Sequence, residues 1–121
     1  MKERVAILGA SNQPARYACM AGALLQEHGY QVVPVNPNKA HILGQDCLHS
    51  LEETDEPVDT VTVYINSTRF QGHLDAILKA KPRRIIFNPG AECPETYGLL
   101  EDKGIEVIEA CTLVLLHTGQ Y

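Results

Sequence analysis

The chain has 121 residues, enough to build one hydrophobic core, and we predict that residues 1–121 form a single domain. Hydrophobic residues make up 45% of the chain and charged residues 21%, a mixture that excludes an intrinsically disordered protein. Lys and Arg number 10 against 15 Asp and Glu, and the resulting net charge of −5 excludes a general affinity for the nucleic-acid backbone.

The first residues lead into an apolar stretch without a secretion signal, and no apolar run is long enough to cross a membrane. The cysteines have neither a Cys-x-x-Cys pair nor the spacing of a zinc site: Cys19, Cys47, Cys93 and Cys111. We therefore expect a cytoplasmic protein with reduced thiols, no metal site and no membrane or nucleic-acid partner.

The first predicted strand is Arg4–Leu8, whose apolar core is typical of a parallel strand covered on both faces. It ends at Gly9. A helix is predicted next, with Asn12 able to cap it and Pro14 suited to its first turn. One helix face carries small side chains and a leucine that would lie against a sheet: Ala18, Ala21, Gly22 and Leu25.

The second predicted strand is Gln31–Val35. Pro34 within it cannot donate to a ladder, so it favours either the end of a strand or a place at the edge of the sheet. A very short third strand is predicted around 46–48. The β-branched run at 60–65 predicts the next strand.

The second half of the chain continues the alternation of helices and strands. Asn66 or Ser67 is predicted to cap a helix that Pro82 ends. Its core positions are Phe70, Leu74, Ile77 and Leu78. The remaining predicted elements are a strand at Arg84–Phe87, a helix from Pro94 to Gly104, a strand at 106–108 and a helix at Thr112–His117.

Strands alternating with helices predict an α/β protein with a Rossmann-like three-layer fold and a parallel sheet of about five strands. The polar loops all follow strands, and the carboxyl ends of parallel strands meet at one edge of a sheet, where ligands bind in such folds. We therefore expect one site built from five loops: 9–16, 36–39, 66–69, 88–92 and 109–112.

The first of these loops is predicted to hold phosphate. Gly9 can make the tight turn, and Ser11 can offer its N–H and hydroxyl to a phosphate oxygen. Arg16 can add charge-assisted hydrogen bonds. The glycine fingerprint of dinucleotide-binding folds is missing, and the alternative interpretation is an ordinary turn in which Ser11 or Asn12 caps the helix and Arg16 is solvated.

The second loop bears on which nucleotide binds. An NAD-binding unit usually has an acidic residue at the end of this strand, whereas this chain has Asn36 followed by Lys39. An uncharged residue followed by a cation suits a ribose that bears a phosphate, as in NADP or coenzyme A. Lys39 as a solvated surface lysine is the alternative.

Other residues give weaker indications. The turn at Asn88, Pro89 and Gly90 would bring backbone close to a ligand. Cys111 follows the last strand at the ligand edge, where a buried small hydrophobe is the alternative role, and Cys93 could be a reactive thiol at a helix N-terminus. The chain has no Ser-His-Asp order, no Gly-x-Ser-x-Gly elbow and no histidines at metal spacing, so we do not expect an enzyme.

Several stretches together resemble a known family. They are Val-Ala-Ile-Leu-Gly-Ala-Ser-Asn-Gln-Pro-Ala-Arg (5–16), His-Gly-Tyr-Gln-Val-Val-Pro-Val-Asn-Pro-Asn (28–38), Ile-Leu-Gly-Gln (42–45) and Pro-Val-Asp-Thr-Val-Thr-Val-Tyr (57–64). They look like the small CoA-binding domain proteins, which are similar to the nucleotide-binding domain of the succinyl-CoA ligase α subunit. The ligase carries its phosphorylated histidine in a separate domain, so the resemblance implies binding rather than ligase chemistry.

The resemblance implies where coenzyme A would lie. Its phosphates would contact Gly9, Ala10, Ser11 and Arg16. Its adenosine end would lie by Val35, Asn36, Pro37 and Lys39, with Tyr64, Ile65 and Asn66 on the cleft floor. Its pantetheine arm would lie near the loop of Asn88, Pro89 and Gly90, and Cys111 falls where related sequences often carry a cysteine. The chain departs from the family's Arg-x-Ser pattern, because Ala18 stands at the serine position.

We therefore expect non-catalytic binding of coenzyme A or an acyl-CoA, through its phosphates and adenosine, at the carboxyl edge of the sheet. One alternative is an NADP-binding oxidoreductase or redox sensor domain, which Lys39 permits. Another is a partner subunit whose nucleotide site is vestigial.

Overall fold

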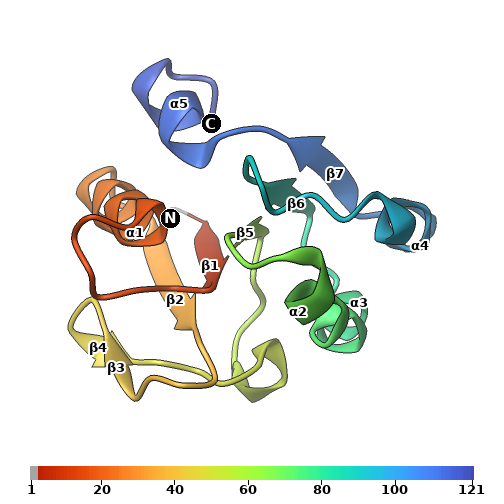
Figure 1. Ribbon diagram of the computed structural model, residues 1–121, viewed down its shortest axis with the longest axis horizontal. Helices are drawn as coiled ribbons and strands as arrows, with labels where there is room; N and C mark the ends of the chain where they lie inside the picture. Colours follow the sequence, from red (N-terminus) through yellow and green to blue (C-terminus); the bar gives the residue numbers. More distant parts are fainter. Residues whose placement is uncertain (1–2) are drawn as a thin grey trace.

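The computed structural model describes residues 3–121. Five parallel strands form one sheet in the order β2-β1-β5-β6-β7 (Figure 1), as the alternation of strands and helices predicts. The α/β Rossmann-like fold is thereby confirmed. The strands are β1 (Arg4–Leu8), β2 (Gln31–Val35), β5 (Thr60–Val63), β6 (Arg84–Phe87) and β7 (Glu106–Glu109).

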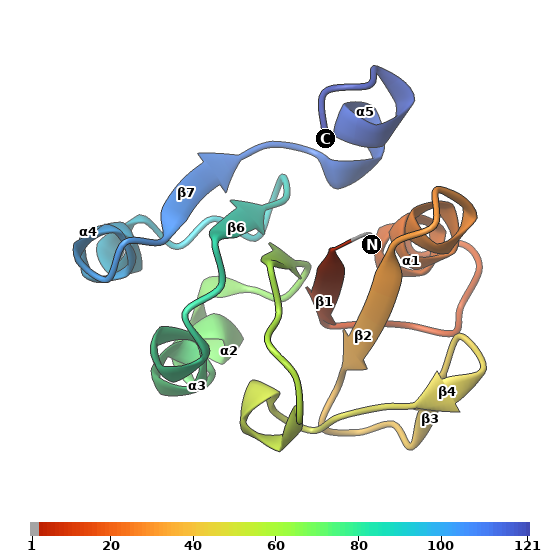
Figure 2. The same cartoon turned by 180° about the vertical axis from the view of Figure 1, so that it is seen from behind.

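Helices cover both faces of the sheet (Figures 1 and 2). One face is covered by α1 (Tyr17–Glu27) and α5 (Thr112–His117). The other is covered by η1 (Leu51–Glu53), α2 (Ser67–Gln71), α3 (Leu74–Ala80) and, after η2 (Pro94–Thr96), α4 (Tyr97–Asp102). Within residues 3–121, no helix has the length and apolar character to traverse a bilayer.

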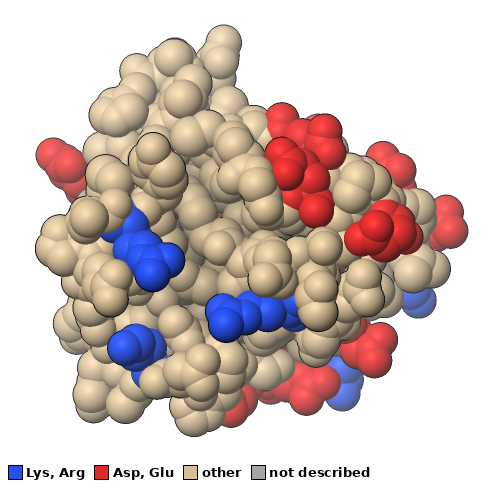
Figure 3. All heavy atoms as spheres, in the orientation of Figure 1, with Lys and Arg blue, Asp and Glu red and all other residues tan. Residues whose placement is uncertain are grey.

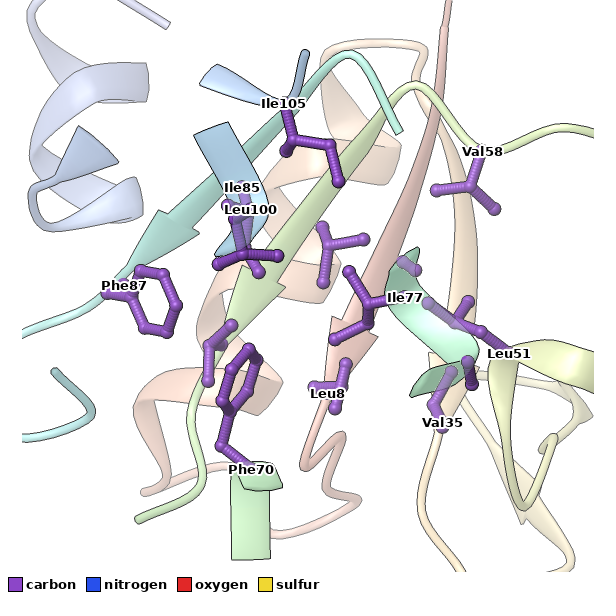
Figure 4. Packing of buried hydrophobic residues seen from close by; sticks show 14 of the residues in the cluster. Leu8, Val35, Leu51, Val58, Phe70, Ile77, Ile85, Phe87, Leu100 and Ile105 are labelled. Atoms are coloured by element: carbon purple, nitrogen blue, oxygen red, sulfur yellow. The ribbon is translucent and has the colours of Figure 1, made fainter. Parts of the chain in front are cut away.

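The core follows from the alternation of side chains along each strand. Val5 and Ile7 of β1 pack into the layer of α1 and α5, whereas Ala6 and Leu8 face the layer on the other side. That second layer is drawn in Figure 4. Phe70, Ile77 and Leu100 of the helices form one cluster with Ile85 and Phe87 of β6, and all five side chains are fully buried. The rings of Phe70 and Phe87 meet edge to face with centroids 5.0 Å apart.

The helix α1 begins later than predicted, and Asn12 does not cap it. The Asn12 side chain instead binds the hairpin of β3 (His41–Ile42) and β4 (Gln45–Asp46): its Nδ2 donates to the His41 carbonyl at 2.7 Å, and its Oδ1 accepts from the Leu43 N–H at 3.3 Å. Pro14 also disfavours helical backbone at the residue before it. The predicted cap is therefore wrong, and the loop after β1 is longer.

Two other predicted elements differ in detail. The helix predicted after Asn66 is broken into α2 and α3 at Gly72 and His73, although both pieces bury their apolar side chains on the same face. The short third strand predicted around 46–48 is replaced by the β3–β4 hairpin, and only Leu48 forms a parallel bridge to Val35.

The strand β2 lies at the edge of the sheet, as Pro34 predicts. Its outer side is partly occupied by the segment that follows it. The Gln45 Nε2 donates to the Val32 carbonyl at 2.9 Å, and the Leu48 N–H donates to the Pro34 carbonyl at 2.9 Å. Pro34 has no N–H, but within residues 3–121 no further strand of the sheet lies on the outer side of β2, so no hydrogen bond between strands is lost there.

Candidate functional site

The loop after β1 makes a tight turn at Gly9, as its sequence predicts. The φ angle of Gly9 is +90°, and a Cβ placed there would stand 2.7 Å from the Ile65 Cγ2. The N–H groups of Gly9 and Ala10 both donate to the Val35 carbonyl, at 3.0 and 3.3 Å. The turn therefore holds the ends of β1 and β2 together and keeps the loop backbone close to the chain that follows β5.

The start of α1 offers free donors to the space above this loop. Its cap residue, Arg16, makes no side-chain capping bond, and the first turn contains no acidic residue. No residue in the described part of the chain accepts a hydrogen bond from the N–H of Tyr17 or Ala18. A helix of eleven residues with an uncapped N-terminus favours an anion there.

Two side chains of the same loop keep donors available. The Ser11 Oγ accepts from the Gln13 N–H at 3.0 Å, so its own proton is still free to donate. The Arg16 Nε donates to the Gln13 Oε1 at 3.1 Å, which orients the guanidinium and leaves its other N–H groups free. Both residues therefore suit an anionic ligand.

Two adjoining cavities form a cleft at the carboxyl edge of the sheet. The larger has a volume of about 530 Å³ and the smaller about 210 Å³, and they share walls at Gly9, Asn36, Ile65 and Arg69. The structure brings most of the predicted site residues to the larger cavity: Gly9, Ala10, Ser11, Arg16, Asn36, Lys39, Tyr64, Ile65, Asn66, Asn88, Pro89 and Gly90. Pro37 lines the smaller one.

Two predicted site residues line neither of these cavities. Val35 is buried in the hydrophobic core beneath the cleft, at 1% exposure. Cys111 is half-buried at the start of α5. Val35 therefore supports the loop beneath the cleft, through the two hydrogen bonds that its carbonyl accepts from Gly9 and Ala10.

The charge of the cleft is opposite to that of the chain as a whole. Arg16, Lys39 and Arg69 line it, and among residues 3–121 no Asp or Glu lines either cavity. Figure 3 shows basic side chains around a hollow on this face, with most acidic side chains to the right or along the lower rim. An electropositive cleft in an acidic protein attracts anions.

The cleft cations differ from the arginines at the other end of the strands. Arg83 and Arg84 reach the Glu3 carboxylate at 2.6 and 3.4 Å. Within the part of the chain that the structure describes, the side chains of Lys39 and Arg69 form no ion pair or hydrogen bond. These two charges therefore have no internal role that would compete with a ligand.

The asparagines of the site loops mainly hold the loops in place. Asn36 joins two of them, because its Nδ2 donates to the Ala10 carbonyl at 2.9 Å and its Oδ1 accepts from the Asn38 N–H at 2.9 Å. Asn66 caps α2 by accepting from the Arg69 N–H at 2.9 Å, as predicted. Their side chains therefore position the cleft walls.

Asn88 is the most deeply buried of these asparagines, at 2% exposure. Its Nδ2 donates to the Thr62 Oγ1 at 2.7 Å and to the Val63 carbonyl at 2.9 Å. Its Oδ1 accepts from the Thr112 N–H at 2.8 Å. The side chain thus fastens β5, β6 and the start of α5 to one another beneath the cleft.

The Tyr64 hydroxyl and the Cys93 thiol both have a raised pKa, which favours their neutral forms. Burial raises the pKa of Tyr64 to about 12. Burial, together with the Glu95 carboxylate 2.7 Å from its Sγ, raises the pKa of the Cys93 thiol. Cys93 is therefore not the activated thiol that its position before a helix suggested. The described residues contain no group of three His, Cys, Asp or Glu that could hold a metal ion.

Several lining residues were not singled out from the sequence, of which Arg69 is the most informative. It lies in α2 at the end of the predicted site loop 66–69 and lines both cavities. Gln13, Asn38 and Ala91 also lie in predicted site loops without having been named as contacts. Tyr17, Ala18 and His73 line the cleft from outside those loops.

Comparisons with known proteins agree with this geometry. A family model described as "CoA binding domain" matches residues 3–117. The protein YneT of Bacillus subtilis is 31% identical over 115 residues, which cover 95% of this chain and 85% of YneT. A crystal structure of an uncharacterized protein is 38% identical, with a TM-score of 0.92, over 100% of this chain and 99% of that one.

A further solved structure, that of cell-free ID.343 from Thermus thermophilus, is 31% identical with a TM-score of 0.90, over 99% of this chain and 91% of that one. The family model covers nearly all of the chain. The resemblance carried by the stretches 5–16, 28–38, 42–45 and 57–64 is thereby confirmed, and the chain belongs to the CoA binding domain family.

Proposed function

We propose that this protein binds coenzyme A or an acyl-CoA in the cleft, without catalysing a reaction of its own. The observation that carries the proposal is the charge of the cleft: among the residues that the structure describes, three cations and no carboxylate line it, in a chain of net charge −5. A diphosphate and a ribose phosphate are the parts of coenzyme A that such a surface would stabilise.

The parts of the ligand have matching places along the cleft. The phosphates would lie against the uncapped start of α1, near Ser11 and Arg16. The adenosine end would lie toward Asn36 and Lys39, and the pantetheine arm would run past the turn at 88–91. NADP has a similar phosphorylated ribose, but the family match favours coenzyme A and gives NADP no support.

We propose the absence of catalysis because, among the residues that the structure describes, the larger cavity lacks the side chains that most often act as catalytic acids or bases. The described walls of the larger cavity include no Asp, Glu, His or Cys. Ser11 is the hydroxyl nearest to the expected phosphates, and no base accompanies it among those walls. The groups present there bind and orient a ligand.

Calorimetric titration with coenzyme A, dephospho-CoA, NAD and NADP tests the proposal. We expect coenzyme A to bind most tightly and NAD most weakly, because NAD lacks both the ribose phosphate and the pantetheine arm. Preference for NADP would favour the oxidoreductase or redox-sensor alternative. Failure of all four ligands to bind would contradict the proposal and favour a vestigial site.

Replacing Arg16 tests the phosphate end of the cleft. We expect Arg16→Ala to weaken binding of coenzyme A by about 1.5–3 kcal/mol, the usual contribution of hydrogen bonds to charged groups. Calorimetry would measure the dissociation constants. Lys103→Ala removes one exposed positive charge distant from the cleft walls and should leave them unchanged. Equal affinities for Arg16→Ala and Lys103→Ala would remove Arg16 from the site.

A further inference from the structure

Arg69 stands where the two cavities of the cleft meet. It lines both of them, whereas Arg16 and Lys39 line only the larger one. Among the described wall residues, Arg69 is therefore the one cation that a ligand occupying both cavities would have to pass.

The backbone of Arg69 is fixed, but its side chain is free. Its N–H donates to the Asn66 Oδ1 at 2.9 Å, and the next residue, Phe70, is fully buried and donates its N–H to the Asn66 carbonyl at 2.9 Å. The guanidinium is exposed and has no partner within residues 3–121. A cationic side chain suits ligand recognition when its backbone is held in place and no carboxylate of the protein competes for its N–H groups.

The smaller cavity has the character of a site for a purine. Gly9, Pro37 and Ile65 give it apolar walls, and Asn36 and Asn38 add amides. Its remaining wall is His73, whose pKa is lowered by burial. Apart from Arg69, the residues that line the smaller cavity therefore carry little charge, which suits an uncharged purine ring.

The order of groups in a nucleotide then places a ribose beside Arg69. A purine in the smaller cavity and a diphosphate at the start of α1 are joined by the ribose, which must cross the junction of the two cavities. A phosphate on that ribose would face the guanidinium, which binds phosphate through paired N–H donors.

We propose that Arg69 recognises the ribose phosphate together with Lys39, which lines the larger cavity. Arg69 would thereby distinguish coenzyme A from dephospho-CoA. This inference rests on the proposed function, since it assumes that a coenzyme A-like ligand fills both cavities. It adds a determinant of specificity to the interpretation in which Lys39 alone reads this phosphate.

The test compares two ligands that differ only in this phosphate. Calorimetry would give dissociation constants of coenzyme A and dephospho-CoA for the unaltered chain, Arg69→Ala and Arg69→Lys, with Lys103→Ala as the control for loss of one charge. We expect Arg69→Ala to weaken coenzyme A about 10- to 100-fold and dephospho-CoA less than about threefold. Arg69→Lys should restore part of the difference, because the charge remains but the paired donors are lost.

The outcomes separate this inference from the proposed function. Equal losses for the two ligands in Arg69→Ala, or no loss for either, would overturn the role of Arg69 while coenzyme A binding stands. Absence of binding of both ligands by the unaltered chain would overturn the proposed function itself. Since Arg69 is exposed and its capping bond is made by its backbone, thermal unfolding of the variants should match that of the unaltered chain.

Discussion

Asn88→Leu is expected to lower the free energy of unfolding by about 3–4 kcal/mol. Leucine has a similar size, but it leaves the buried Thr112 N–H without a partner and removes one bond each from the Thr62 hydroxyl, which keeps the Thr112 hydroxyl at 2.8 Å, and from the Val63 carbonyl, which keeps the Asn88 N–H at 3.3 Å. A buried polar group left unsatisfied costs about 1–3 kcal/mol, and each other lost hydrogen bond about 0.5–1.5 kcal/mol. Urea unfolding followed by circular dichroism would measure the change.

Two further variants separate the hydrogen bonds of Asn88 from its shape. Asn88→Asp keeps the shape and can still accept from the Thr112 N–H, but an ionised carboxylate cannot donate to the Val63 carbonyl, so it should remain destabilising. Asn38→Leu, at an exposed position, should change stability by less than about 0.5 kcal/mol. Unaltered stability in Asn88→Asp would show that the two bonds donated by the Asn88 Nδ2 do not contribute.

Gly9→Ala is expected to lower the free energy of unfolding by about 2–4 kcal/mol and to weaken coenzyme A binding. The residue has a φ angle of +90°, which L side chains rarely adopt, and its new Cβ would stand 2.7 Å from the Ile65 Cγ2. Relief of this contact would push apart the loop after β1 and the chain after β5, both of which line the cleft. Urea unfolding and calorimetry would measure the two effects.

Gly90 provides a matched control for the backbone part of this effect. Its φ angle is also +90°, but a Cβ there would meet no atom within 4 Å. Gly90→Ala should therefore cost only the strain of positive φ, about 1–2 kcal/mol. If the two alanine variants lost the same stability, the close approach of Gly9 to Ile65 would have no energetic consequence.

Sequence patterns predicted the sheet well because its strands are buried on both faces and read as apolar runs, as at Arg4–Leu8 and Arg84–Phe87. They predicted the break between α2 and α3 poorly. Phe70, Leu74 and Ile77 keep helical spacing across Gly72, because both helices face the same layer, so periodicity cannot reveal the interruption.

The same limit applies to the polar residues of the cleft. Topology sufficed to bring the loop residues together, since all of them follow parallel strands. It could not reveal where each side chain points. Asn12 finds its partners in the β3–β4 hairpin, and Asn88 finds its own in β5 and α5, through contacts distant in sequence. The sequence placed Arg69 in a site loop, but it could not show that the side chain lines both cavities without a partner among the described residues, because these are properties of the folded chain.

The occupied outer side of β2 bears on whether the sheet can grow by addition of a strand from another molecule. An incoming strand needs free backbone donors and acceptors. At β2 it would meet a proline without an N–H and two carbonyls already bound by Gln45 and Leu48. At β7, the opposite edge, the exposed Glu106 and Glu109 would place like charges against a second copy. Edge-to-edge aggregation is therefore opposed by hydrogen-bond geometry on one side and by charge repulsion on the other.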